Sequence, residues 1–169
     1  MEASPLRQVL TSHQEVVNVP ADFLWELMVE KIRRPDKFVP GVSDVEIVRE
    51  IDPTTHSVER KMRGGGNLIH EVISADKISK TVVFRIHASN PNFRGFVTNT
   101  ILPADEAATE EDGVSSSSCV LDFTMNWAAK PGAADSAVDG AKAAMPEKIR
   151  GAVQLSKSVA EEAWKAKKG

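Results

Sequence analysis

The spacing of hydrophobic residues changes along the chain, and each change predicts a different element. Residues 8–17 mix valines and a leucine with polar side chains, which predicts a first strand. In residues 23–32 the hydrophobic positions recur at steps of three and four, the spacing of one helical face. Pro20 suits the first turn of this helix, whereas Pro35 keeps Arg34 out of helical geometry. A short helix is therefore expected between the two prolines.

From Val42 onward the period becomes two, which is typical of strands with one buried face. Strands are expected at 45–51, 57–63, 68–74, 81–88, 95–102 and 118–128, and the short turns between most of them favour an antiparallel meander. Residues 103–118 are acidic, rich in Ala and Ser and without periodicity, so they predict a mobile surface loop.

The last segment, 133–168, predicts a long helix with one apolar seam. The seam consists mostly of small residues, which suits a lid over a concave sheet: Val138, Ala141, Met145, Ile149, Ala152, Ser156, Val159 and Ala163. Pro146 lacks the N–H that would bond to Lys142, so we expect either a kink or a break near Met145. If the helix breaks, its first part becomes a separate segment that could gate a cavity.

These elements predict an α+β fold: a curved antiparallel sheet of about seven strands, one or two short N-terminal helices and a long C-terminal helix across the concave face. The length of 169 residues fits one domain, 1–169. A net charge of −3 argues against a basic nucleic-acid surface, and no apolar run is long enough for stable membrane insertion. Cys119 is the single cysteine, which excludes an internal disulfide and fits a reducing, cytoplasmic location.

Two stretches carry a resemblance to known proteins. Residues 19–27, with Pro20 a few positions before Trp25, are similar to the first strand-to-helix junction of the helix-grip (SRPBCC) superfamily. That superfamily includes START lipid-transfer domains, the birch-pollen allergen and bacterial polyketide cyclases and aromatases. A more specific motif resembles the AtaL-like subgroup of bacteria and fungi: Trp25, Leu27, Lys31, Pro35, Phe38, Val39, Pro40, Glu46, Glu50 and residues 99–101. Asp44 stands where that subgroup often has a cysteine.

The resemblance implies a cavity between the sheet and the last helix for a small hydrophobic or amphipathic molecule. Its expected lining combines Asn99 with apolar residues of two other strands and the last helix: Phe84, Ile86, Leu121, Phe123, Met125, Trp127, Met145, Ile149, Ala152 and Val153. The alternative is that these residues simply form the core. No cofactor is expected, and a homodimer is left open.

Polar residues within strands are the candidates for chemistry. His70 shares a face with Leu68 and Val72, which favours an inward position, and Asn99 shares one with Val97 and Ile101. A hydrogen-bonded core position is the alternative for both, so the catalytic residues stay unknown, with His70 and Asn99 as candidates.

Other polar residues are interpreted as solvent-facing. Arg85 and His87 lie opposite Phe84 and Ile86 in their strand, which favours an outward position. The four histidines lack metal-ligand spacing, so no metal site is expected. The basic residues at the end of the first helix fit a solvated helix terminus, or the mouth of a cavity that takes an acidic ligand: Lys31, Arg33, Arg34 and Lys37.

Three functions compete on this evidence. The first is a binding protein for a lipid- or polyketide-like ligand. The second is a cyclase- or dehydratase-like enzyme in which His70 and Asn99 act on an enolisable substrate held over Trp127. The third is a protein-interaction module similar to the chaperone-activator branch of the superfamily, using residues 103–118 or the exposed face of the last helix.

Overall fold

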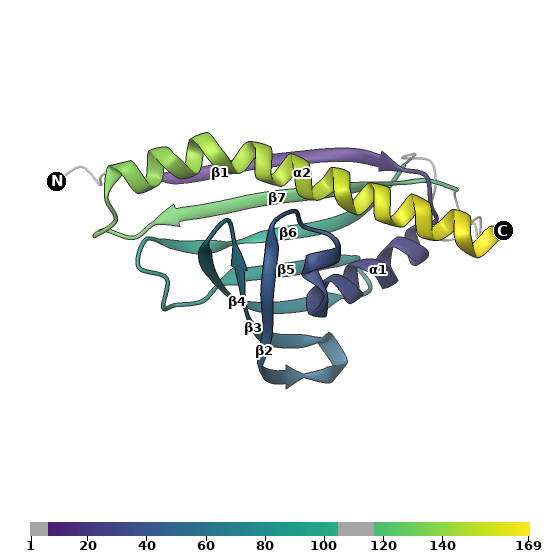
Figure 1. Cartoon of the computed structure of the whole chain (residues 1–169), viewed down its shortest axis with the longest axis horizontal. Helices are drawn as coiled ribbons and strands as arrows, with labels where there is room; N and C mark the ends of the chain where they lie inside the picture. Colours follow the sequence, from purple (N-terminus) through teal and green to yellow (C-terminus); the bar gives the residue numbers. More distant parts are fainter. Residues whose placement is uncertain (1–6, 105–116) are drawn as a thin grey trace.

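Seven antiparallel strands form one curved sheet with two helices on its concave side (Figure 1). The structure is a computed structural model and describes residues 7–104 and 117–169. The strands are β1 (Gln8–Val17), β2 (Val42–Asp52), β3 (Ser57–Gly64), β4 (Asn67–Asp76), β5 (Thr81–Ile86), β6 (Phe93–Pro103) and β7 (Cys119–Ala129). The helices are α1 (Ala21–Arg33) and α2 (Asp135–Lys168), with 3₁₀ turns η1 (Pro35–Lys37) and η2 (Pro53–Thr55).

The strand order is β1-β7-β6-β5-β4-β3-β2. Strands β2 to β7 form the predicted meander, in which each strand pairs with the next along the chain. Strand β1 pairs with β7 over its whole length, from Gln8 opposite Ala128 to Val17 opposite Cys119. The predicted α+β helix-grip architecture is confirmed. Most of the loop expected at 103–118 lies outside the described residues.

Register assigns each side chain to one face, because residues paired across strands point the same way. One concave row runs through Val58, Ile73, Phe84, Val97 and Met125. A neighbouring concave row contains Ala75, Val82, Asn99 and Phe123, and a third contains Arg60, Glu71 and Ile86. The concave face is therefore apolar apart from a few polar side chains.

Helix α1 begins directly after Pro20, whose extended backbone precedes the first turn. Its stripe of Leu24, Met28 and Ile32 is fully buried against the sheet. The helix ends at Arg33, in agreement with the expected effect of Pro35 on the preceding residue. It therefore covers the wide end of the concave face.

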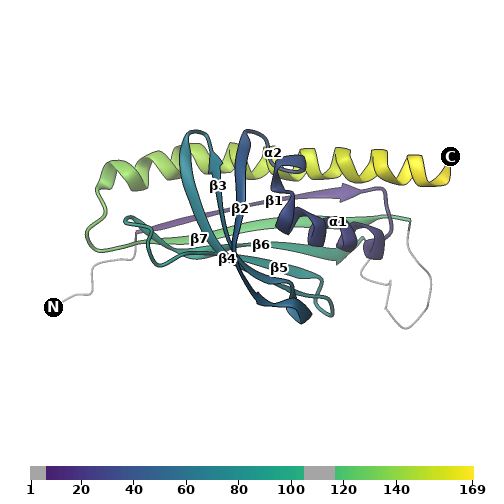
Figure 2. The ribbon, with the colours of Figure 1, turned by 60° about the horizontal axis from the view of Figure 1, so that its bottom comes forward.

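Helix α2 lies along β1 and β7 on the same side of the sheet as α1 (Figure 2). Polar side chains of α2 reach the open edge of β1. Lys157 donates to the Val16 carbonyl oxygen at 2.6 Å, and Glu161 accepts from the Asn18 N–H at 2.9 Å. These contacts satisfy backbone groups that an edge strand leaves unpaired.

The break considered at Pro146 is wrong. Residues 135–168 form one helix of 34 residues with Pro146 inside it, and its ribbon curves along its length (Figure 1). The missing N–H affects only one bond of the ladder, and the packing of Ala141 and Ile149 against the sheet holds both sides of the proline in place. A separate gating segment before Met145 is therefore not present.

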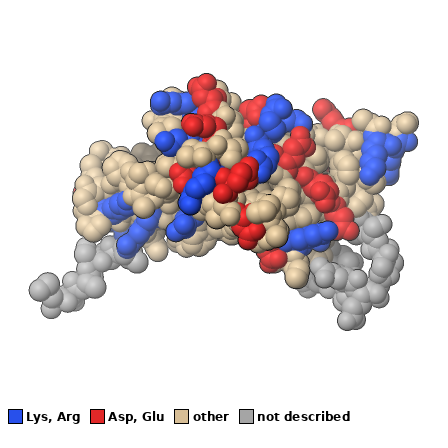
Figure 3. Space-filling model, turned by 90° about the horizontal axis from the view of Figure 1, so that it is seen from below, with Lys and Arg blue, Asp and Glu red and all other residues tan. Residues whose placement is uncertain are grey.

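Two further features bear on the site. Gly95 in β6 has φ +126°, and a Cβ there would overlap the Asn126 carbonyl oxygen of β7. Only glycine lets the two strands approach this closely. On the face seen from below, acidic and basic side chains are intermixed (Figure 3). Among residues 7–104 and 117–169, no helix is both long and apolar enough to cross a membrane.

Candidate functional site

Lys31 lies in the interior, between α1 and the concave face of the sheet. Its side chain is only 5 % exposed, although the residue stands two positions from the end of α1. It occupies the helical face of Leu24 and Met28, which points into the core. The expectation of a solvated basic cluster is therefore wrong for Lys31, whereas Arg33, Arg34 and Lys37 are exposed.

Asn99 of β6 holds the Lys31 ammonium group. Lys31 Nζ donates to Asn99 Oδ1 at 2.5 Å, and Asn99 is 2 % exposed. Two aromatic rings flank the same nitrogen, with the Phe123 centroid at 4.0 Å and the Phe84 centroid at 5.1 Å. Ring faces attract a cation, so this apolar setting still offers the charged form some stabilisation.

Arg60 of β3 is a second cation in this interior, at 2 % exposure. It donates to the carbonyl oxygen of Ile32 at 2.7 Å and to that of Lys31 at 3.3 Å. Its other terminal nitrogen pairs with Glu71 of β4 at 2.9 Å. Arg60 thus satisfies two carbonyl groups at the C-terminal end of α1, which would otherwise lack partners.

Burial, with a smaller contribution from the positive charge of Arg60, lowers the pKa of Lys31 to about 7, whereas Glu71 acts in the opposite direction. Burial dominates because removing an ammonium group from water penalises its charged form. An ordinary lysine is almost fully protonated at neutral pH, but a lysine with this pKa is neutral in a large fraction of molecules. A neutral amine has a free lone pair and can act as a base or a nucleophile.

Among residues 7–104 and 117–169, three buried side-chain nitrogens have no hydrogen-bond partner: Arg60 Nε, Asn99 Nδ2 and Trp127 Nε1. All three are N–H donors. Buried donors are paired in the great majority of cases, because an unpaired one loses its hydration without compensation. The interior is therefore suited to a group that supplies acceptor oxygens.

The structure brings the expected lining residues together. Strand residues Phe84, Leu121, Phe123 and Met125 and helix residues Ile149, Ala152 and Val153 are buried in one apolar cluster. Ile86, Trp127 and Met145 are half-buried and pack against that cluster, and Trp127 contacts Phe93 at a centroid distance of 5.3 Å. Asn99 is the polar member of the expected set, and its sheet position places it in the same interior.

His70 lies on the opposite face of the sheet, so the inward position expected for it is wrong. Its neighbours in sequence explain this: Glu71 and Ile73 belong to the concave rows, so His70 must point to the convex side. Leu68, which suggested an inward face, is itself exposed. His70 and Asn99 are therefore not brought together. Arg85 lies exposed on the convex side, as expected, and His87 lies beside His70.

On the convex side, Glu59, His70 and His87 offer three potential metal-ligand atoms within 4.8 Å of one another. Their ring nitrogens are already engaged in hydrogen bonds. His70 Nε2 lies 2.9 Å from Glu59 Oε2, and His87 Nδ1 accepts from the Ser89 N–H at 3.1 Å. The two imidazole rings stack in parallel at 3.7 Å, so their in-plane lone pairs do not converge on one point. The cluster has the form of a surface hydrogen-bond network.

Two open depressions lie on the surface of the described residues. One is lined by Arg33, Arg34, Asp36 and residues 42–45, and the other by Thr55, Thr81, Val83 and part of 74–79. The side chains expected to line the sheet–helix interior are buried or half-buried. Helix α2 comes near the rest of the concave rim at two places: a Cβ on Gly65 would lie 3.8 Å from Lys148 Nζ, and one on Gly151 would lie 3.9 Å from Pro40 Cγ.

The sequence contained a signal for the buried cations that was not used. Lys31 continues the helical stripe at seven positions from Leu24 and three from Met28. Arg60 alternates with Val58 and Met62, both buried, so its strand position already assigned it to the apolar face. Charged residues in apolar stripes are more informative than those at helix ends.

Comparison with known proteins agrees with the motif seen in the sequence. Residues 9–163 match the model of a family described as acetylaranotin biosynthesis cluster protein L (AtaL). The chain belongs to the AtaL family. The match spans the sheet, α1 and most of α2, and thus includes Lys31, Asn99 and Arg60. No match was found among the curated proteins.

Several solved structures share the fold of this AtaL family member. The ZhuI aromatase/cyclase from Streptomyces sp. R1128 has a TM-score of 0.66 at 16% identity, covering 91% of this chain and 94% of that chain. Norcoclaurine synthase from Thalictrum flavum, in complex with dopamine and hydroxybenzaldehyde, has a TM-score of 0.64 at 13% identity, covering 93% and 88%. A START superfamily protein from Mycobacterium smegmatis has a TM-score of 0.65 at 10% identity, covering 91% and 98%. At these identities the likeness establishes the fold.

Proposed function

We propose that this AtaL family protein binds a small, oxygenated aromatic or polyketide-like molecule between the concave face of the sheet, α1 and α2. The observation that carries the proposal is the set of three unpartnered donors in an interior otherwise lined by aromatic and aliphatic side chains. Ligand sites are typically apolar with a few polar groups that fix orientation. The protein is proposed to act in the cytoplasm, where the single buried Cys119 stays reduced.

The chemistry of the donors discriminates between ligand classes. A plain acyl chain would leave Asn99 Nδ2, Trp127 Nε1 and Arg60 Nε unpaired, whereas carbonyl and hydroxyl oxygens would pair with them. The rings of Phe84 and Phe123 suit the face of a flat aromatic ligand. Among the superfamily's ligand types, the interior thus favours polyketide-like molecules over lipids. The names of the aromatase/cyclase neighbours point in the same direction.

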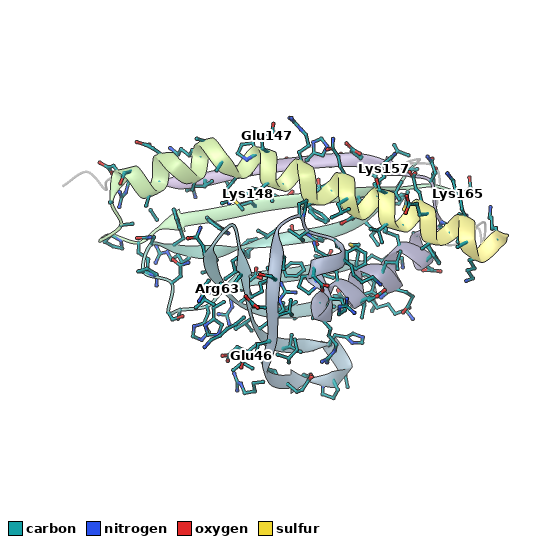
Figure 4. The ribbon with its side chains drawn as sticks, viewed as in Figure 1. Glu46, Arg63, Glu147, Lys148, Lys157 and Lys165 are labelled. Carbon is teal, nitrogen blue, oxygen red and sulfur yellow. The ribbon has the colours of Figure 1, made fainter. Side chains whose placement is uncertain are left out.

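Entry to the interior requires side chains to move, because the residues that line it are buried or half-buried. Near the Gly65 turn and near Pro40, α2 approaches the rim through side-chain ends. Met125 and Met145 are unbranched and can change rotamer at low cost. We propose the rim between Lys148 on α2 (Figure 4) and the Gly65 turn after β3 as the mouth.

Calorimetry or native mass spectrometry against phenolic polyketides, with fatty acids as comparison, tests the proposal. We expect one polyketide to bind per chain and Asn99→Leu to weaken its binding about tenfold, the loss of one well-formed hydrogen bond. The matched control is Thr98→Val in the same strand, because Thr98 lies on the convex face. Absence of binding, or equal effects of the two variants, would overturn the proposal.

A cyclase- or dehydratase-like activity in the same interior is the second candidate. The version in which His70 and Asn99 share a substrate is not supported, since they lie on opposite faces. Lys31 favours a revised version, because it is a titratable group beside Asn99 and its pKa of about 7 suits general base catalysis at neutral pH. In D₂O the natural chain is expected to exchange the α-hydrogens of a bound diketone, and Lys31→Met is expected to lose this exchange. Exchange at the same rate in both proteins would exclude this role.

The interaction-module alternative depends on residues 103–118, most of which are not described, or on the exposed face of α2. Binding of a protein partner that survives deletion of 105–116 and disappears with charge reversal on α2 would support the helix face. The described contacts favour the small-molecule site.

A further inference from the structure

Lys31 differs from the other polar groups of the interior in being a nucleophile. Its amine is packed between the rings of Phe84 and Phe123 and is held by Asn99, so its direction is fixed. Among the described residues, no carboxylate forms an ion pair with Lys31, and Glu71 pairs with Arg60 instead at 2.9 Å. A purely structural role does not require an amine at this position, since an apolar side chain of similar length would fill the same space.

We propose that Lys31 forms a reversible imine with the carbonyl group of an aldehyde or ketone ligand bound in this interior. The inference rests on the proposed function, because the same site must admit the ligand. It narrows the ligand class from oxygenated aromatic molecules to those with a reactive carbonyl group. The binding would be covalent and reversible, with Lys31 as the attachment point.

Asn99 is placed to serve both partners of the reaction. Its Oδ1 accepts a hydrogen bond from Lys31 Nζ, which leaves the lone pair of the neutral amine free. Its Nδ2 is buried and has no acceptor in the structure. A carbonyl oxygen that accepts from Nδ2 places its carbon next to the Lys31 nitrogen. One amide group would thus orient the nucleophile and polarise the electrophile.

The step is balanced without a further reagent. The Nζ lone pair attacks the carbonyl carbon, and the π electrons of the C=O bond move to oxygen. Transfer of a proton from nitrogen to oxygen gives a carbinolamine. The nitrogen lone pair then forms the C=N bond as the C–O bond breaks, and the oxygen leaves as water after taking up a second hydrogen. In total, amine and carbonyl give imine and one molecule of water.

The surroundings favour the neutral amine that this step needs. Burial is the main cause of the lowered pKa of Lys31, and Arg60 contributes in the same direction, while Glu71 opposes both. Arg60 and Glu71 are the charged groups that influence Lys31 from β3 and β4. Near pH 7 a large fraction of Lys31 is neutral, whereas exposed lysines are almost fully protonated. Selective reaction is therefore expected at neutral pH.

Trapping with a reductant tests the inference on the full chain. The protein is incubated with 4-hydroxybenzaldehyde and cyanoborohydride at pH 7, and modified lysines are located by peptide mass spectrometry. We expect Lys31 to be modified at least about tenfold faster than exposed Lys148 in the same sample, since far more of it is neutral. Modification of Lys31 at a rate no higher than that of Lys148 would overturn the inference.

A second measurement separates this inference from the proposed function. Lys31→Met removes the amine but keeps an unbranched side chain of similar volume, and Lys31→Arg serves if the first variant does not fold. Both should lose trapping at position 31, while trapping at exposed Lys148 stays unchanged, and binding of a phenolic ligand without a carbonyl group is measured on the natural chain. Binding of such phenols by the natural chain without trapping at Lys31 would refute imine formation and leave the proposed site intact. If the natural chain neither binds such phenols nor is trapped at Lys31, both the proposed site and imine formation are refuted.

Discussion

Lys31 Nζ donates a 2.5 Å hydrogen bond to Asn99 Oδ1 and thereby links α1 to β6 inside the protein. The two residues are 68 positions apart in the sequence. The bond fixes Oδ1 of the Asn99 amide, and its Nδ2 is left without an acceptor among the described residues. The hydrogen bond thus orients the Asn99 amide, while burial is the main cause of the lowered pKa of the Lys31 amine.

Replacing Lys31 by Met should stabilise the protein in a pH-dependent way. The folded-state pKa of about 7 lies below the ordinary lysine value of 10.5, so the folded state binds fewer protons than the unfolded state between these values. The unfolding free energy of the natural chain should therefore rise with pH between about 7 and 10.5. Below pH 7 the destabilisation that comes from burying the Lys31 amine is fully present. The upper limit of this penalty is about 5 kcal/mol, and an unpaired Asn99 Oδ1 in the variant offsets about 1–3 kcal/mol.

Urea denaturation at pH 6, 7.5 and 9 measures this effect. The advantage of Lys31→Met should be greatest at pH 6 and shrink toward pH 9. Lys148→Met is the control, since this lysine is exposed and should change stability by less than about 0.5 kcal/mol. An advantage that does not vary with pH would contradict the burial of the ammonium group.

Replacing Arg60 by Met should destabilise the protein by about 3–5 kcal/mol. The variant leaves Glu71 without its partner and the Ile32 carbonyl oxygen without its donor. The double variant Arg60→Met with Glu71→Leu should recover part of the loss, because no carboxylate is then left unpaired. Chemical denaturation of the two variants and of exposed Arg63→Met checks the result. A double variant less stable than Arg60→Met would indicate that Glu71 has another role.

Substituting two glycines should have opposite effects. Gly95→Ala should cost at least about 2 kcal/mol, because φ +126° is unfavourable for alanine and its Cβ would overlap the Asn126 carbonyl oxygen. Gly140→Ala in α2 should stabilise the protein by about 0.5–1 kcal/mol, since nothing lies within 4 Å of the added Cβ. Thermal denaturation of both variants tests this. Similar stability of Gly95→Ala and the natural chain would mean that β6 and β7 are farther apart at Gly95.

Glu59→Gln should reduce stability at neutral pH and have less effect in acid. The hydrogen bond from His70 is the main cause that lowers the pKa of Glu59, so the carboxylate is stabilised in the folded state. That contribution is present above the ordinary carboxyl pKa and is lost as the pH falls through the lowered value. At pH 7 the melting temperature of Glu59→Gln should lie below that of the natural chain, and at pH 3.5 the difference should be smaller. In a His70→Gln background Glu59→Gln should lower the stability by less. Equal losses in both backgrounds would exclude an interaction between Glu59 and His70.

The architecture was predictable because its signals are local and repeated. Alternation identified the seven strands, and Pro20 and Pro35 bounded α1. The break considered at Pro146 was wrong, because it took account of one missing N–H but not of the packing of the residues on either side. In a helix that is anchored along its whole length, tertiary contacts outweigh one missing hydrogen bond.

The candidate site was predictable in part. Alternation placed Asn99 on an apolar face, where it is buried, and the resemblance implied the apolar residues that the structure gathers in the core. Lys31 and Arg60 were not recognised, since a charged side chain at a helix end or in a strand is usually solvated. The inward position predicted for His70 was wrong for a different reason. Its strand neighbours Leu68 and Val72 lie partly exposed on the convex face, so apolar neighbours did not mark the interior. Faces are settled by register across the sheet, which one strand does not reveal.

The pairing of β1 with β7 has a consequence for how the chain folds. The two strands are the first and last of the sheet along the chain, so β1 stays without its partner during synthesis until β7 has left the ribosome. Pairings of such high sequence separation form slowly, because loop closure precedes the contacts that reward it. Until then β1 presents an open backbone edge, and Val9 and Val17, which the folded protein buries, remain exposed on it. Nascent chains of this protein should therefore depend on chaperones in proportion to the time that β1 waits.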